Sequence, residues 1–315
     1  MRTQLPFALL AAALTCSLFA APAQAQRARV FVASYGNDSN PCTFGSPCKT
    51  FQNAFNNVAV GGEITAIDSA GFGSLNITHA ITITSPAGIE AGIVPIAGAD
   101  AIDINAGSND ELNLRGLTIE GAGIGAAGIK FNIGQSLTVE NCVIRHFAGN
   151  GIDFEPIASS SLLVSNTFVG DNNNNGIIIF PAGPGEVTAA FNRVEVYNNG
   201  NQGILVSGGN STGTVSATVS ESSAAKNANS GFLVTLPGSA SIGMTVLHSV
   251  SSNNGTGISA NGGATATLRI GRSTVTGNTF DWLTTSGGVL LSYGDNAIDG
   301  NTNPNMLSPG SLTYK

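Results

Sequence analysis

The chain has 315 residues and is acidic, with 12 Lys and Arg against 19 Asp and Glu and a net charge of −7. Only 10% of the residues are charged, whereas glycine alone numbers 41. A chain with so little positive charge lacks the basic surface that binds nucleic acid, so nucleic acid is excluded as a partner.

The first 25 residues predict a signal peptide. Met1-Arg2 gives a positive start, an apolar run covers residues 5–21, and Ala23-Gln24-Ala25 is a small-x-small cleavage site. We therefore expect a mature chain in the periplasm or outside the cell, cleaved near Ala25. Removing this segment takes away Arg2 and no acidic residue, so the net charge becomes about −8. No later stretch reaches the ~18 apolar residues of a membrane helix, and no membrane span is expected.

Residues 26–62 are predicted to form an entry segment and an N-terminal cap. Cys42 and Cys48 bracket a short loop, and in an oxidising compartment we expect them to form a disulfide. Such a bond would stabilise the fold by about 2–3 kcal/mol in the chain-entropy model. Phe51, Ala54 and Phe55 then share one helical face, which predicts a short capping helix over residues 49–58.

Residues 63–301 contain a repeat. A glycine followed by an apolar residue recurs every 23 to 31 residues, at Gly128-Ile129, Gly151-Ile152, Gly176-Ile177, Gly203-Ile204, Gly231-Phe232, Gly257-Ile258 and Gly288-Val289. Period-two alternation after each glycine indicates a strand. A second alternating strand follows in each repeat, with inward pairs at Leu112/Leu114, Leu137/Val139, Leu162/Val164, Ala189/Phe191, Ala217/Val219, Met244/Val246 and Leu268/Ile270. A further apolar or small position comes five residues later, as at Ile144 and Val169.

These repeats predict an all-β fold, a right-handed parallel β-helix of about nine coils. Each strand would pair in parallel with its equivalent one repeat later, about 4.8 Å away. A left-handed helix of hexapeptides needs about 18 residues per coil, fewer than are found here, and the leucine-rich consensus is absent. An asparagine column is predicted to form a hydrogen-bonded ladder and contains Asn172, Asn199, Asn227, Asn254 and Asn278.

The remaining structural expectations concern single residues and the C-terminus. Cys142 falls at an interior position and is expected to be an inert buried thiol. Trp282 is expected to anchor the long turn before Gly288. Residues 302–315 are predicted to be an irregular tail. Because the chain has no CxxC pair and no histidine cluster, we expect no zinc site.

The entry motifs at residues 31–41, 47–52 and 61–64, together with the repeat, resemble the pectin-lyase-like superfamily. This resemblance implies a right-handed parallel β-helix and a polysaccharide as partner, but the superfamily holds many activities. Its polygalacturonase-like members carry Asp beside the Gly-Ile strand. The residues before the glycines are not acidic in this chain and are Ala127, Asn150, Asn175, Gln202, Ser230, Thr256 and Gly287. Whether the chain is an enzyme therefore stays open.

The strongest candidate site lies on the outward face of the Gly-Ile strands. Asp103, Lys130 and Asp153 are predicted to stack on successive coils, with Asn132 and Glu155 two residues further along. Asp153 and Glu155 could supply oxygen ligands for Ca²⁺, the one cofactor that the sequence suggests. Lys130 could act as a catalytic base or as a clamp for a uronate. The alternative is a solvated ion pair of little consequence.

Two further columns are candidates for contacts. Arg193, Glu221, His248 and Arg272 follow the second strand on successive coils and could bind an acidic sugar or simply alternate in charge on the surface. Ile178, Leu205 and Leu233 form an outward apolar strip. Such a strip favours self-association, a partner or a sugar-stacking groove, unless residues 181–185 or the tail cover it.

Two functional hypotheses of different classes follow. The first is an exported protein that interacts with extracellular or cell-envelope polysaccharide, with no catalytic reaction that can be assigned. The second is a non-enzymatic structural or adhesive surface protein. A Ca²⁺-dependent polysaccharide lyase or epimerase is a further alternative.

Overall fold

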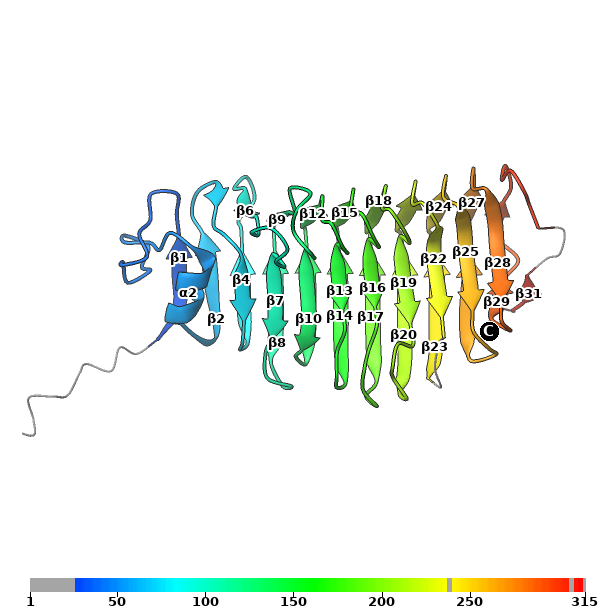
Figure 1. The fold of residues 1–315 in the computed structure, drawn as a ribbon, viewed down its shortest axis with the longest axis horizontal. Helices are drawn as coiled ribbons and strands as arrows, with labels where there is room; N and C mark the ends of the chain where they lie inside the picture. The colour runs from blue at the N-terminus through cyan, green and yellow to red at the C-terminus, as the bar shows by residue number, and fades with distance from the viewer. Residues whose placement is uncertain (1–25, 237–239, 306–308, 314–315) are drawn as a thin grey trace, which may run out of the picture.

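The computed structural model describes residues 26–236, 240–305 and 309–313, and these form a parallel β-solenoid. Its strands stack along the long axis of the molecule, from β1 at one end to β29 and β31 at the other (Figure 1). Every pairing between its numbered strands is parallel, and strands of three sheets alternate along the chain. The predicted signal peptide lies outside the described residues.

Three sheets form the sides of the solenoid. The twelve-stranded sheet contains β1 (Arg27–Val32), β2 (Val58–Ala66), β5 (Ile81–Thr84), β8 (Glu111–Arg115), β11 (Ser136–Glu140), β14 (Ser160–Ser165), β17 (Val187–Asn192), β20 (Thr214–Ser220), β23 (Ser241–Leu247), β26 (Ala266–Gly271), β29 (Val289–Ser292) and β31 (Gly310–Ser311). The ten-stranded sheet contains β3 (Ala70–Gly71), β6 (Ala91–Ile93), β9 (Leu117–Glu120), β12 (Val143–Arg145), β15 (Phe168–Gly170), β18 (Glu195–Tyr197), β21 (Ser223–Ala225), β24 (Val250–Ser252), β27 (Thr274–Thr276) and β30 (Ala297–Ile298).

The third sheet holds the predicted Gly-Ile strands. This nine-stranded sheet contains β4 (Leu75–Ile77), β7 (Ile102–Asn105), β10 (Ile129–Ile133), β13 (Ile152–Phe154), β16 (Ile177–Ile179), β19 (Ile204–Ser207), β22 (Ser230–Thr235), β25 (Thr256–Asn261) and β28 (Phe280–Thr285). Nine strands in succession enclose eight complete turns, close to the nine coils predicted.

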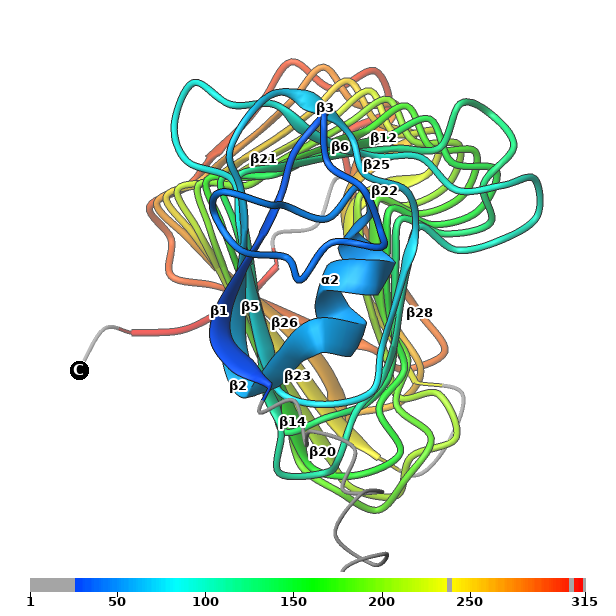
Figure 2. The same cartoon turned by 90° about the vertical axis from the view of Figure 1, so that its left-hand side faces the viewer.

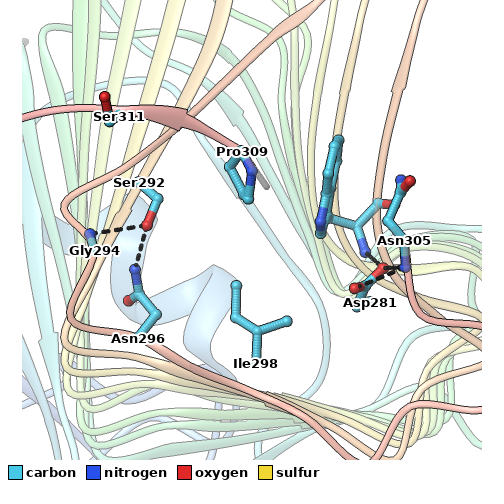
Figure 3. A pocket seen from close by; sticks show the side chains of 9 residues that line it. Asp281, Ser292, Gly294, Asn296, Ile298, Asn305, Pro309 and Ser311 are labelled. Carbon is cyan, nitrogen blue, oxygen red and sulfur yellow. Dashed lines mark hydrogen bonds between the residues drawn. The ribbon is translucent and has the colours of Figure 1, made fainter. Parts of the chain in front are cut away.

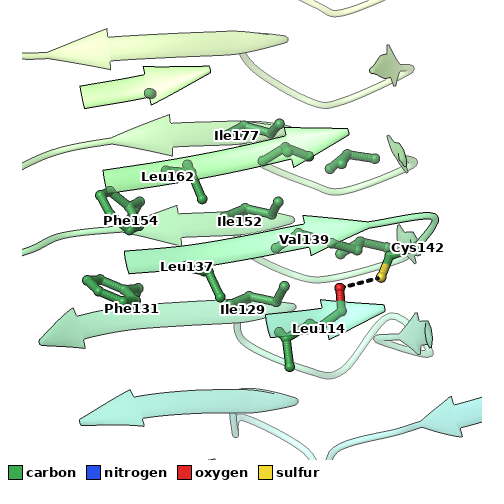
Figure 4. Close-up of a cluster of buried hydrophobic side chains, with 14 of the residues drawn as sticks. Leu114, Ile129, Phe131, Leu137, Val139, Cys142, Ile152, Phe154, Leu162 and Ile177 are labelled. Carbon is green, nitrogen blue, oxygen red and sulfur yellow. Dashed lines mark hydrogen bonds between the residues drawn. The ribbon is translucent and has the colours of Figure 1, made fainter. Parts of the chain in front are cut away.

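The core consists of the inward columns that the period-two alternation predicts. Leu137 pairs with Leu112 on one side and Leu162 on the other, and Ile152 stands between Ile129 and Ile177 in the facing sheet. Figure 4 shows these columns filling the space between two sheets. All of these side chains are at most 2% exposed. Burial of each large aliphatic side chain contributes about 1.5–3 kcal/mol, so repetition of the coil builds the core.

The glycine column exists because the next coil passes very close to it. A Cβ built on Gly176 would lie 2.2 Å from Cγ1 of Val196 and 2.9 Å from the side-chain nitrogen of Asn199. The same crowding recurs at Gly151, against Val169 and Asn172 of the following coil. The glycine and asparagine columns are therefore two parts of one packing requirement.

The predicted asparagine ladder is confirmed. The Asn199 side-chain amide donates to Oδ1 of Asn227 at 2.9 Å, and Oδ1 of Asn199 accepts from the Asn172 amide at 3.0 Å. The ladder continues through Asn254 and Asn278 to Asn301, with the links from Asn227 onward 3.0–3.1 Å long. Its members between residues 172 and 278 are at most 2% exposed, so these hydrogen bonds satisfy polar groups that water cannot reach.

Cys142 belongs to a second buried ladder, at the turn between the twelve- and ten-stranded sheets. Thr167, Ser222, Ser249 and Ser273 occupy equivalent places, and each hydroxyl donates to the carbonyl two residues earlier at 2.7–2.9 Å. The Cys142 thiol makes the same bond to Glu140 at 3.3 Å. Burial raises the pKa of this thiol to about 11. The group is therefore protonated and unreactive, as expected.

One end of the solenoid is closed by the predicted cap. Helix α2 (Phe51–Asn57) buries Phe51, Ala54 and Phe55, and the Thr50 hydroxyl accepts from the Asn53 backbone N–H at 3.2 Å. Figure 2, a view along the solenoid, shows α2 lying across its end. The predicted disulfide between Cys42 and Cys48 is present. Within the described residues no helix is long and apolar enough to cross a membrane.

The sequence interpretation of the last coil was wrong. Val289 does not continue the Gly-Ile column, because β29 pairs with β26 in the twelve-stranded sheet. The strand that continues the column is β28, in which Trp282 pairs with Ile258 and Asp281 stands in the glycine position. Trp282 therefore points into the end of the core, 9% exposed, and does not anchor a turn. The spacing misled because β28 lacks the glycine that marks the six strands before it in this sheet, from β10 to β25.

Candidate functional site

The candidate site lies on three neighbouring strands of the nine-stranded sheet. Lys130 on β10 pairs with Asp103 on β7 and with Asp153 on β13, so the predicted stacking of these residues is correct. Their neighbours Ile129 and Ile152 point inward and are fully buried, which fixes the three polar side chains on the outer face.

Lys130 is the centre of this cluster. Its ammonium donates to Oδ2 of Asp153 at 3.1 Å and to Oε2 of Glu155 at 2.5 Å. The side chains of Lys130 and Asp153 are only 22% and 12% exposed, and that of Glu155 is 35% exposed. The cluster is thus more enclosed than an ordinary surface ion pair, whose contribution to stability is small.

Asp103 forms the other half of the cluster. Its carboxylate accepts from the Asn132 amide at 2.8 Å and from the Asn105 amide at 2.9 Å. Regular pairing of β7 with β10 would set Asn105 beside Asn132, but the register shifts between Phe131 and Ile133, so that Asn105 pairs with Ile133. The irregularity places both amides around one carboxylate.

The pKa shifts of the cluster favour binding over proton abstraction by the lysine. Burial by itself would lower the pKa of Lys130, but the hydrogen bonds and negative charges of Glu155 and Asp153 raise it overall. The ammonium therefore stays protonated at neutral pH, which suits a clamp and opposes the role of a base. Burial raises the pKa of Asp153, against the opposing effect of Lys130.

One oxygen of the cluster is buried and unsatisfied. Oδ1 of Asp153 is inaccessible and has no hydrogen-bond partner in the described part of the chain. The side-chain amide of Asn150 is close enough to lower the pKa of Asp153 but does not have the geometry of a hydrogen bond to Oδ1. A buried acceptor without a donor costs about 1–3 kcal/mol, and such sites are often where function resides.

The calcium ligand set is not preformed. Asp153 and Glu155 both direct an oxygen to the ammonium of Lys130. Among the residues that the structure describes, no three His, Cys, Asp or Glu side chains are placed to hold one metal ion. Ca²⁺ takes six to eight oxygen ligands, so these carboxylates could hold it only after Lys130 had moved.

The second predicted column is a row of turn residues. Arg193, Glu221, His248 and Arg272 all have positive φ, between 48° and 53°, and each is the first of the two residues that turn the chain from the twelve- to the ten-stranded sheet. Arg272 contacts Asp295, with Nε and Oδ2 3.5 Å apart. Over the described ranges no ion pair joins Arg193, Glu221 and His248 to one another. The structure therefore places them in one column without a shared contact.

The apolar strip is formed as predicted, since Ile178 pairs with Leu205 and Leu205 with Leu233. All three side chains are partly exposed. The strip follows the polar cluster directly, because Ile178 also pairs with Asp153. One outer face thus carries a polar and an apolar section.

Sequence reasoning missed a polar cluster at the turn that leaves the ten-stranded sheet. Glu120 accepts from Arg145 and from Nδ1 of His146, each at 2.9 Å, and Nε2 of His146 lies 3.8 Å from Asp171. Burial would raise the pKa of Glu120, but the Ala122 N–H and these two side chains lower it overall. Glu120, His146 and Asp171 line a hollow of about 320 Å³. The signal that could have revealed this cluster is that Glu120 and Arg145, and likewise His146 and Asp171, stand one repeat apart in the sequence.

Comparison with known proteins identifies the family. A family model described as the right handed beta helix region matches residues 50–217. The chain belongs to this family. A search of curated proteins found no match.

Two solved structures resemble the fold. One is the pectate lyase Pel9A, with a TM-score of 0.62 and 15% identity over 89% of this chain and 78% of that one. The other is the A-module of the mannuronan C-5 epimerase AlgE4 from Azotobacter vinelandii, with a TM-score of 0.46 and 13% identity over 91% of this chain and 89% of that one. At these identities the likeness concerns the fold, so function must be argued from the residues of this chain.

Proposed function

We propose that this protein is exported and binds polysaccharide on the outer face of the nine-stranded sheet, at the cluster of Asp103, Lys130, Asp153 and Glu155. The observation that carries the proposal is the charged cluster itself, in which the side chains of Lys130 and Glu155 stay 22% and 35% exposed on the outer face of the sheet. A sugar hydroxyl can donate to such a carboxylate and accept from such an ammonium. The likeness to a pectate lyase is in keeping with this class of ligand.

The cluster fits recognition better than a reaction. Two carboxylates contact the one ammonium and that of Asp103 lies on the adjacent strand, so hydroxyl groups are favoured over bare uronate carboxylates as partners. The neighbouring strip of Ile178, Leu205 and Leu233 offers an apolar surface along which the C–H faces of a sugar chain could continue. Arg193, Glu221, His248 and Arg272 form a separate column, and we assign any acidic sugar to that column.

Export is part of the proposal. The Cys42–Cys48 disulfide is typical of proteins that mature in an oxidising compartment. Residues 1–25 have the order of features found in a signal peptide. N-terminal sequencing of the protein recovered from outside the cytoplasm would test this, and a chain that begins at Met1 would contradict it.

Binding should be measured with neutral and acidic polysaccharides, with and without Ca²⁺, together with the absorbance of unsaturated uronates. Lys130→Ala should weaken binding by roughly ten- to a hundredfold, because it removes hydrogen bonds between charged groups that hold the cluster in place. Lys226→Ala is the matched control, since Lys226 lies outside the cluster and contacts the ring of Tyr197. Neither binding nor turnover on any glycan would overturn the proposal.

The same experiment separates the alternatives. Formation of unsaturated uronates that depends on Ca²⁺ would indicate a lyase, the activity that the cluster supports least. The second candidate is a structural or adhesive rod that associates through Ile178, Leu205 and Leu233, which are partly exposed on three successive coils. Sedimentation that depends on protein concentration, without glycan binding, would favour this candidate.

A further inference from the structure

A cavity of about 380 Å³ lies at the C-terminal end of the solenoid, away from the cluster on β7, β10 and β13. Its lining includes Asp281, Trp282, Asn296, Ile298 and Asn305. Figure 3 shows Ile298 and Pro309 facing the space between Asn296 on one side and Asp281 with Asn305 on the other. The volume is within the range of small-molecule sites, roughly 300–1,000 Å³.

The position of this cavity in the repeat explains why an indole and a carboxylate side chain lie beside it. Trp282 takes the inward place that Ile258 holds one coil earlier, and Asp281 takes the place of Gly257. A side chain fits at this position because β28 is the last strand of its sheet, and only an isolated bridge from Phe280 to Asn303 follows it. A glycine followed by an aliphatic residue is required only where a further coil stacks on the strand, so the requirement ends at β28.

Trp282 presents an unused donor. Its side chain is nearly buried, with the residue 9% exposed, and its backbone N–H donates to Asp281 at 2.7 Å. In the described part of the chain the indole N–H has no hydrogen-bond partner. It is not an enclosed atom either, because Oδ1 of Asp153 is the one fully buried side-chain atom without a partner there. The indole N–H thus remains accessible on a residue that lines the cavity.

The other polar groups around the cavity are held in place. Both oxygens of Asp281 accept from the Asn305 backbone N–H at 3.0 Å, and Asp281 is 4% exposed. The Asn296 amide donates to the Ser292 hydroxyl at 3.0 Å and to the Ile270 carbonyl at 3.1 Å. Fixed acceptors and one free donor next to Ile298 form an amphipathic site of a preorganised kind.

We propose that this cavity binds the end of a neutral saccharide. The indole N–H would donate to a sugar oxygen, Asp281 and the asparagine oxygens would accept from hydroxyl groups, and Ile298 and Pro309 would contact C–H faces. Within the described residues no Lys or Arg forms an ion pair with Asp281, so its charge disfavours a uronate. This inference concerns a different part of the molecule from the proposed polysaccharide face and does not depend on it.

The chain contains one tryptophan, so its fluorescence reports on this cavity alone. The full-length mature protein is titrated with mannobiose and galactobiose to about 50 mM, well above a millimolar Kd, and in parallel with digalacturonic acid. A saturable emission change with a neutral disaccharide, together with protection of Trp282 from acrylamide quenching, is the expected result. A response only to digalacturonic acid, no response at all, or a tryptophan that acrylamide cannot reach in the free protein would overturn the proposal.

Two variants separate this site from the polysaccharide face. Trp282→Phe, followed by calorimetry, should weaken the neutral disaccharide by roughly fivefold, the effect of one neutral hydrogen bond. Lys130→Ala should leave the fluorescence titration unchanged while it weakens polysaccharide binding. A fluorescence response lost in Lys130→Ala would contradict a separate site at the C-terminal end. The wild-type titration remains decisive if Trp282→Phe does not fold.

Discussion

An interior coil and the last coil of this solenoid use the same positions for different purposes. In the coil around β16, Gly176 and Ile177 stand between the coils before and after them, Gly176 has no room for a Cβ, and Ile177 is fully buried. At the equivalent positions of β28, Asp281 and Trp282 stand beside a cavity. The difference teaches that a solenoid coil is constrained from both sides, and that chemical variety enters where one neighbour is missing.

An interior coil and the last coil also differ in how they hold a buried carboxylate. Asp153 and Asp281 are both buried carboxylates, 8% and 4% exposed. Asp281 has hydrogen bonds at both oxygens, whereas Asp153 has one oxygen on Lys130 and the other without a partner. The interior coil thus holds its unsatisfied acceptor on the outside of the sheet, and the last coil holds its unsatisfied donor, the indole of Trp282, at the end of the core.

The largest expected effect is that of a methyl group in the glycine column. Gly176→Ala should lower the free energy of unfolding by about 3 kcal/mol, because the new Cβ would overlap Val196 and the backbone of Gly203. Asp281→Ala, at the equivalent place in the last coil, should cost less, about 1.5 kcal/mol, because it removes hydrogen bonds but creates no overlap. Chemical denaturation of both variants measures the contrast, and equal losses would break it.

A smaller difference is expected along the asparagine ladder. Asn199→Ala leaves the buried backbone N–H and side-chain amide of Asn172 without an acceptor and should cost about 2 kcal/mol. Asn301→Ala, at the end of the ladder, should cost less than about 1 kcal/mol, because Asn301 is only partly buried and water can replace it. A thermal unfolding midpoint that drops further for Asn301→Ala would show that the end of the ladder carries the stability.

The smallest effect concerns pH and the outer cluster. Burial raises the pKa of Asp153 above 3.8 in the folded state, so folding opposes its ionisation. Asp153→Asn should therefore be slightly more stable than the wild type at neutral pH, and the advantage should vanish as the pH falls through the folded pKa of Asp153. Urea denaturation across this pH range measures it. An advantage that grows at low pH would show that burial does not raise the pKa of this carboxyl.

Much of the fold could be predicted because each coil repeats one physical solution. Period-two alternation placed Leu137 and Ile152 in the core, and equal spacing placed Lys130 between Asp103 and Asp153. The misplacement of Val289 had a physical cause, since β28 replaces glycine by Asp281 and the signal for the column disappears where the constraint does. Contacts of His146 with Glu120 and Asp171 were not predicted, because they depend on how turn residues point.

The sequence by itself determined the stacked coil, its inward columns, the asparagine ladder, the cap helix and the disulfide, because each follows from local spacing repeated many times. Only the tertiary structure decided that Lys130 remains charged between two carboxylates, that Asp153 has an oxygen without a partner, and that Trp282 faces a cavity. These features depend on distances of a few ångströms between side chains on different coils. A periodic pattern gives the column in which a residue lies but not the direction of its polar atoms.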